Sequence, residues 1–150
     1  MTELTQKWVN RFFDKAKEVS MWSKDRTGVG AVAVKNRAAV SDGYNGFPRG
    51  VDDSPLRYGD SELKYKLVVH AEQNAIYNAA REGVSLLGAD MFVYGLPTCH
   101  ECAKAIIQSG IEKVWMMHGP MREKWRDSFE YTKLMFSEAG VEWECVEIGS

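Results

Sequence analysis

Apolar residues recur at helical spacing in four stretches of the chain. In residues 4–20 every third or fourth position is apolar and most positions between are polar or charged, which predicts an amphipathic helix that covers a sheet. In residues 70–81 the recurring residues are mostly alanine, which predicts a helix that packs closely against the sheet and is largely buried. The same spacing predicts two more helices, over 99–108 and 121–138.

The remaining apolar runs are short and rich in valine, as in β-strands. Runs at 29–34 and 38–40 are separated by three polar residues, which predicts a β-hairpin. Runs at 89–94, 111–117 and 141–146 alternate with the predicted helices. This alternation predicts an α/β fold in which a sheet carries helices on both faces.

One long segment breaks the alternation. Residues 43–55 are rich in glycine, proline and asparagine, which predicts a loop without regular structure, and loops of this length often carry function. A chain of 150 residues is long enough for one well-packed core, so we expect a single domain over 1–150.

Charge and hydropathy narrow the classes of partner. The chain has 19 basic and 21 acidic residues, a net charge of −2, which lacks the basic excess that binding a nucleic-acid polymer usually needs. No apolar run approaches the ~20 residues of a membrane helix, and the N-terminus has no hydrophobic export core. We therefore expect a cytoplasmic protein with neither a membrane nor a nucleic-acid partner.

The chemistry-bearing residues form two short clusters at predicted helix starts. The first holds His70 and Glu72, and the second holds Cys99 and Cys102. Imidazole and thiolate are the donors that Zn²⁺ prefers, and catalytic zinc sites use three protein ligands so that a fourth position stays open for water. The pattern therefore predicts a zinc site formed by His70, Cys99 and Cys102.

Glu72 is expected to act as acid and base rather than as a ligand. It lies about 200° around the helix axis from His70, so the two side chains cannot easily bind one ion. The expected work of Glu72 is to take a proton from the attacking water, pass it to N3 of a cytosine ring, and then protonate the departing amine. A His-x-Glu followed by Cys-x-x-Cys is the signature of zinc deaminases.

Two plainer interpretations of the same residues stay open. Cys99 and Cys102 alone also fit a redox pair or two buried thiols. A closed structural zinc site would need a fourth ligand, and His100 points away from the side that the two cysteines share, so we expect it to be exposed. His118 is expected to have an ordinary structural role, and Cys145 to be a buried hydrophobic residue.

Beyond these clusters the sequence resembles the deoxycytidylate (dCMP) deaminases of the cytidine deaminase superfamily over roughly residues 3–146. The segments that carry the resemblance are SKDRT (23–27), GYNGFPRGVDD (43–53), KYKLVVHAE (64–72), HAEQNAI (70–76) and CHECAKAIIQSGI (99–111). The resemblance implies a three-layer α/β/α fold with a mixed five-stranded sheet. It also implies hydrolysis of dCMP to dUMP with release of ammonia, activation by dCTP, inhibition by dTTP, and a hexameric homo-oligomer.

The resemblance also implies roles for residues outside the metal site. Arg26 is expected to contact the substrate phosphate and Asn45 to hydrogen-bond the deoxyribose, roles that suit a guanidinium fork and an amide. Tyr44, Gly46 and Arg49 are implied as contacts to the nucleotide effectors. A solvated arginine and a common Asn-Gly turn are the plainer interpretations of Arg26 and Asn45.

The sequence departs from the family pattern at two places. Many relatives have proline directly before the first cysteine, whereas this chain has Thr98 there, after Pro97. Where tyrosines near the substrate are expected in many relatives, this chain has the segment 115–121, so the preference between dCMP and 5-substituted forms stays open. Rival functions are deamination of free cytidine or 5-substituted dCMP, editing of nucleic acid, and a zinc-binding module without catalysis.

Overall fold

The computed structural model describes residues 3–148 and contains a mixed five-stranded sheet with the order β2-β1-β3-β4-β5. Strand β1 runs antiparallel to both β2 and β3, whereas β3, β4 and β5 are parallel to one another. This confirms the predicted mixed sheet. The strands are β1 (Gly30–Lys35), β2 (Ala38–Tyr44), β3 (Asp90–Gly95), β4 (Lys113–His118) and β5 (Glu142–Glu147).

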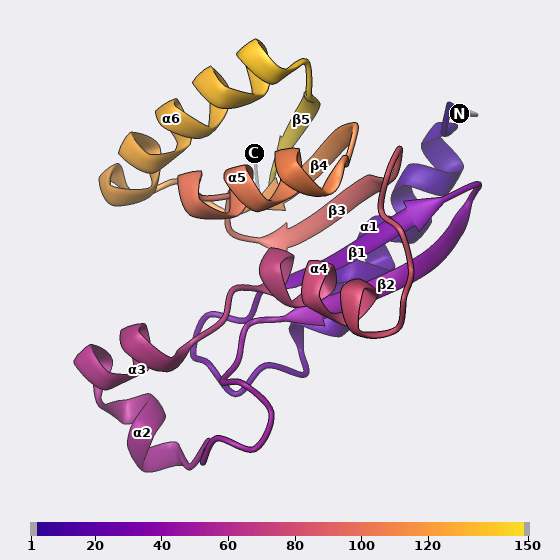
Figure 1. Cartoon of the computed structure of the whole chain (residues 1–150). Helices are drawn as coiled ribbons and strands as arrows, with labels where there is room; N and C mark the ends of the chain where they lie inside the picture. Colours follow the sequence, from indigo (N-terminus) through magenta and orange to yellow (C-terminus); the bar gives the residue numbers. More distant parts are fainter. Residues whose placement is uncertain (1–2, 149–150) are drawn as a thin grey trace.

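Helices cover both faces of the sheet, which gives the three layers (Figure 1). Helix α1 (Gln6–Ser20) lies behind the sheet, and α4 (Ala71–Arg81), α5 (His100–Ser109) and α6 (Glu123–Ala139) lie in front of it. Two short helices, α2 (Pro55–Gly59) and α3 (Ser61–Leu67), sit beyond the end of the sheet. None of the helices within residues 3–148 is long and apolar enough to cross a membrane.

Each face of the sheet has its own apolar core. Phe92 is fully buried on the α1 side, where it stacks on Trp115 and meets Phe12 and Phe13 of the helix. On the opposite side the alanines of α4 and the apolar face of α5 pack on β1, β3 and β4. Burying these side chains supplies the main drive for folding, at about 25 cal/mol per Å² of apolar surface.

Helix α4 lies unusually close to β2. Gly43 faces the α4 backbone so tightly that a Cβ there would stand 2.6 Å from the carbonyl oxygen of Ala71, which no side chain can tolerate. Polar side chains then tie the two elements together. Asn74 Nδ2 donates to the carbonyl of Tyr44 (2.8 Å), and Asn78 Nδ2 donates to the carbonyl of Asp42 (2.8 Å). The start of α4 is thereby held rigidly against the sheet.

The structure corrects three predictions. Strand β2 runs to Tyr44, because its residues pair with β1 where a loop was expected from position 43. Helices α2 and α3 occupy part of the next segment and were not predicted, since both are short and neither has a buried residue. Cys145 is exposed rather than buried, because β5 is the edge strand and faces solvent on the side away from β4.

Candidate metal centre and active-site pocket

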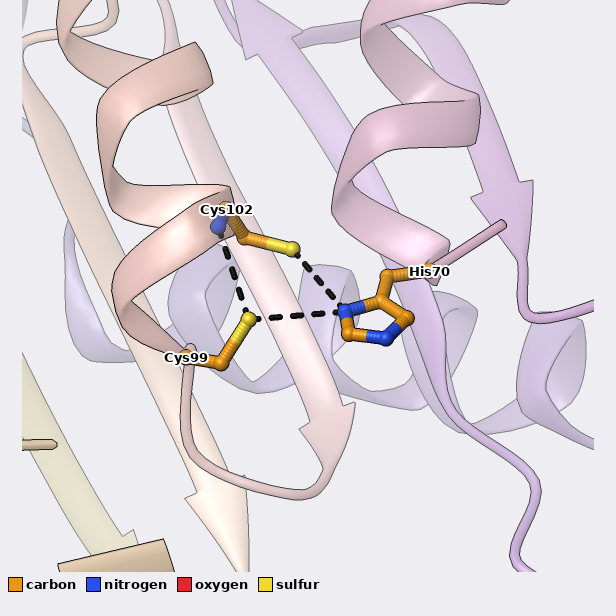
Figure 2. Close-up of side chains that lie close together, drawn as sticks. All are labelled: His70, Cys99 and Cys102. Carbon is orange, nitrogen blue, oxygen red and sulfur yellow. Dashed lines mark hydrogen bonds between the residues drawn. The ribbon is translucent and has the colours of Figure 1, made fainter. Parts of the chain in front are cut away.

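Three side chains from two helix starts converge on one point (Figure 2). His70 Nδ1 lies 3.4 Å from Cys99 Sγ and 3.3 Å from Cys102 Sγ, and all three atoms lie within 4.8 Å of one another. Ligands bound tetrahedrally to Zn²⁺ at 2.0–2.3 Å stand about 3.6 Å apart, so the observed spacing fits one zinc ion. The predicted donor set is therefore brought together.

The backbone places these donors at the ends of helices. His70 is the N-cap of α4, and its backbone N–H donates to Gln73 Oε1 (3.2 Å). Cys99 is the N-cap of α5, and its sulfur accepts the backbone N–H of Cys102 (3.4 Å). Cys102 is fully buried one turn further along α5. A helix N-terminus stabilises negative charge, which suits thiolates.

The two thiols differ in their ease of ionisation. Hydrogen bonding from Cys102, assisted by His70, lowers the pKa of Cys99 to about 4. The hydrogen bond to Cys99 and burial raise the pKa of Cys102 well above its usual value. Zinc ligation requires both thiols to be deprotonated, so a bound cation would displace the proton that Cys102 holds more tightly.

The centre has three protein ligands and not four. Among residues 3–148, no other histidine, cysteine or acidic residue joins the group. His100, half-buried rather than exposed as expected, turns to α6, where its Nδ1 lies 2.8 Å from Ser128 Oγ. His118 is buried with its Nδ1 2.7 Å from the carbonyl of Gly119, an ordinary structural role. A three-ligand set leaves a position for water, as catalytic zinc sites require.

Glu72 is buried beside the donor set, with 4% of its surface exposed. Burial, and next the negative charge of Cys99, raise the pKa of its carboxyl to about 7. A carboxyl with a pKa near neutrality can both accept and donate a proton at physiological pH. The environment of Glu72 is therefore that of a general acid and base.

Two side chains of α6 hold the chain that leads into Cys99 and the start of α5. Thr132 Oγ1 donates to the carbonyl of Thr98 (3.0 Å), and Ser128 Oγ accepts the backbone N–H of His100 (3.0 Å). The backbone N–H of Thr98, directly before Cys99, donates to Met116 Sδ (3.4 Å). The Thr98 hydroxyl is fully buried and has no hydrogen-bond partner within residues 3–148.

The metal centre opens into a cavity of about 320 Å³. Glu72, His70 and Cys99 line its buried end, and more exposed residues line its mouth. A volume of this order suits a small ligand rather than a polymer. The lining residues are Asp25, Thr27, Val29, Asn45, Lys64, Tyr65, Val68, His70, Ala71, Glu72, Gly95, Leu96, Pro97, Cys99, Gly119, Pro120, Met121, Arg122 and Trp125.

The pocket includes Asn45 but not Arg26. The Asn45 side chain is fixed by the backbone of the neighbouring loop: its Oδ1 accepts from the Val29 N–H (2.8 Å) and its Nδ2 donates to the Thr27 carbonyl (2.9 Å). Arg26 is exposed and lies outside the lining, although Asp25 and Thr27 on either side of it belong to the lining. A role for Arg26 in phosphate binding stays a prediction.

The residues expected to contact effectors lie outside the pocket lining. Tyr44 is 40% exposed and meets Trp22 edge to face. Gly46 pairs with Val69 in an isolated bridge, and Arg49 donates to Asn78 Oδ1 (2.7 Å) on α4. The roles of Tyr44, Gly46 and Arg49 as effector contacts stay predictions.

Sequence reasoning missed the pocket residues on α3 and at the start of α6. Lys64 and Tyr65 lie six and five positions before His70. This closeness in sequence to a predicted metal ligand was a signal that they could belong to the pocket. Arg122 and Trp125 follow the unusual segment 115–121, which gave no pattern from which a role could be read.

Removing the metal should expose one cysteine selectively. In zinc-stripped protein at neutral pH we expect iodoacetamide to label Cys99 first, because its pKa of about 4 keeps it a thiolate. Cys102 is buried. Partial desolvation of the Cys145 sulfur raises its pKa to about 11 although the residue lies on an exposed strand, so both cysteines react slowly. Mass spectrometry of the peptides over time measures the order, and zinc-loaded protein should protect Cys99. Faster labelling of Cys145 would contradict this assignment.

The fold and the site together define a class of protein. A His/Cys/Cys donor set at two helix starts, with a buried glutamate two residues after the histidine, is the architecture of the zinc-dependent deaminases. The family model for the cytidine and deoxycytidylate deaminase zinc-binding region matches residues 6–118. The chain belongs to this family.

Individual relatives agree with the family match. The chain is 43% identical over 142 residues to an uncharacterized deaminase in the luxG 3′ region of Aliivibrio fischeri, and the match covers 93% of each chain. It is 40% identical over 143 residues to human deoxycytidylate deaminase, covering 89% of this chain and 76% of the relative. A crystal structure of cyanophage S-TIM5 dCMP deaminase in complex with dCMP and dUMP is similar with a TM-score of 0.74 and 26% identity, over 96% and 100% of the two chains.

Proposed function

We propose that this deaminase hydrolyses dCMP to dUMP and ammonia. The observation that carries the proposal is the buried Glu72 carboxyl beside the His70, Cys99 and Cys102 donors at the closed end of a nucleotide-sized cavity. The similarity to dCMP deaminases of human and cyanophage origin supports dCMP as the substrate.

Glu72 moves the protons of the reaction. Its carboxylate takes a proton from the attacking water and delivers it to N3 of the cytosine ring as the C4–O bond forms. It then transfers the second proton of that water to the amine, so that the C4–N bond breaks and ammonia leaves. A pKa of about 7 allows one carboxyl to serve as base and acid in turn. Zinc bound by His70, Cys99 and Cys102 would lower the pKa of the water.

Asn45 is proposed to orient the deoxyribose. Its two backbone hydrogen bonds hold the amide in one position, and Nδ2 carries a second hydrogen that can be donated to a sugar hydroxyl. Preorganisation of this kind lowers the entropy cost of placing the cytosine ring against Glu72.

Regulation and assembly form a further part of the proposal. By resemblance to the family branch that carries GYNGFPRG, dCTP would activate, dTTP would inhibit, and the protein would be a hexamer acting in pyrimidine nucleotide synthesis. The exposed Tyr44 and Arg49, with Gly46 between them, are the proposed effector contacts.

The decisive test is ammonia release by zinc-quantified protein from three substrates: dCMP, deoxycytidine and a cytosine-containing single-stranded DNA. Each is measured with and without dCTP or dTTP, and the mass of the assembly is measured by light scattering. We expect turnover of dCMP, raised by dCTP and lowered by dTTP. Equal turnover of deoxycytidine would favour a nucleoside deaminase, and zinc binding without turnover of any substrate would overturn the proposal.

A further inference from the structure

The mouth of the pocket carries more positive charge than the chain as a whole. Lys64 on α3 and Arg122 at the start of α6 both line the pocket. Lys124 lies just outside the lining, with its Nζ 4.8 Å from the ring centre of Tyr65 and 4.8 Å from that of Trp125. A chain with a net charge of −2 thus concentrates cations where a substrate enters, which favours anionic ligands.

Only one of the two pocket cations is available to a ligand. Lys64 Nζ is 3.2 Å from Asp25 Oδ1, and only 16% and 8% of the two side chains are exposed. Asp25 also lines the pocket, so this ion pair neutralises a carboxylate that would otherwise repel an anion. The Arg122 guanidinium, by contrast, forms no hydrogen bond, ion pair or ring contact with any residue between 3 and 148.

The position of Arg122 in the chain suits an anion-binding role. It is the N-cap of α6, and its carbonyl accepts the N–H groups of Trp125 and Arg126 while its side chain takes no part in capping. The guanidinium is therefore free to extend over the pocket without loss of a helix contact. A guanidinium donates two parallel hydrogen bonds to a phosphate, which a lysine ammonium cannot do.

We propose that Arg122 binds the 5′-phosphate of the substrate and makes the enzyme selective for a nucleoside monophosphate over a nucleoside. This inference rests on the proposed function for its substrate, and assigns to Arg122 the contact that the resemblance assigned to Arg26. Lys64 acts indirectly, by neutralising the Asp25 carboxylate in the pocket lining.

The test compares Arg122→Gln with a matched control, Arg126→Gln one turn further along α6, and with Arg26→Gln, which tests the rival assignment of the phosphate contact. For zinc-loaded protein, kcat/KM is measured with dCMP and with deoxycytidine. We expect Arg122→Gln to lower kcat/KM for dCMP roughly 10- to 100-fold, mainly through KM, because a charge-assisted hydrogen-bond pair is lost. The value for deoxycytidine should not change, nor should either value in Arg126→Gln. A larger loss for dCMP in Arg26→Gln than in Arg122→Gln would overturn the inference.

A binding measurement separates this inference from the proposed function. Calorimetry gives the Kd of dUMP and of deoxyuridine, which need no turnover. Loss of dUMP affinity in Arg122→Gln with deoxyuridine affinity unchanged supports the inference, even if the wild-type protein fails to deaminate dCMP and the proposed function falls. Equal losses for both ligands, or a loss of dUMP affinity in Arg26→Gln and not in Arg122→Gln, would overturn it.

Discussion

Glu72→Gln should abolish ammonia release and leave the zinc in place. The amide has the size of the carboxyl but cannot carry the proton between water, ring nitrogen and leaving amine, and Glu72 is expected to serve each of these transfers. Loss of one general acid–base group lowers the rate by about 10²–10⁴-fold. Because Glu72 is expected to take part in every proton transfer, we expect kcat to fall by about 10⁴-fold. The measurements are kcat for dCMP and zinc content by atomic emission.

The control for this variant is Glu101→Gln. Glu101 is an exposed carboxylate on α5, next to the metal ligand Cys102 in sequence and paired with Lys104 (2.8 Å). Its replacement should leave both kcat and zinc content near wild-type values. Activity of Glu72→Gln above one tenth of wild type would show that another group carries the protons.

Cys102→Ala should lose zinc, activity and thermal stability together. The variant keeps only His70 and Cys99 as donors, and a two-donor site holds Zn²⁺ far more weakly than a three-donor site. We expect less than one tenth of stoichiometric zinc after purification and no measurable turnover. Because a ligand bound only by the native state stabilises that state, the melting temperature should fall by several degrees.

Packing loss at Cys102 has to be separated from metal loss, since the side chain is fully buried. Wild type and Cys102→Ala are therefore melted both with zinc and after treatment with a chelator. If the metal causes the difference, the two melting temperatures converge once zinc is removed. A difference of the same size in both conditions would assign the effect to packing, and Cys145→Ala on the exposed edge strand should change neither value.

The metal site was predictable because its information is local. A helix start fixes where the side chains of its first turn point, so the pairs His70 with Glu72 and Cys99 with Cys102 could be placed on their helices from sequence. That the two helix starts meet depends on the sheet order. The resemblance implied a mixed five-stranded sheet but no strand order, and the structure supplies that order.

The mouth of the pocket could not be predicted, because loop side chains take their direction from tertiary contacts. Asp25 turns inward since it pairs with Lys64 on α3, a helix that sequence periodicity did not reveal. Arg26, the next residue, is thereby exposed outside the pocket. Cys145 shows the same limit in a strand: it was expected to be a buried hydrophobic residue, but its exposure follows from the edge position of β5.

The separation of the metal ligands along the chain makes zinc uptake a marker of folding order. His70 lies 29 residues before Cys99 and 32 before Cys102, and strand β3 runs between them. The two cysteines come together as soon as the first turn of α5 forms, but the histidine arrives only when α4 has docked on the sheet against Gly43. During refolding, tight zinc binding should therefore appear late, after the sheet has formed, and a zinc-sensitive dye would time the docking of α4.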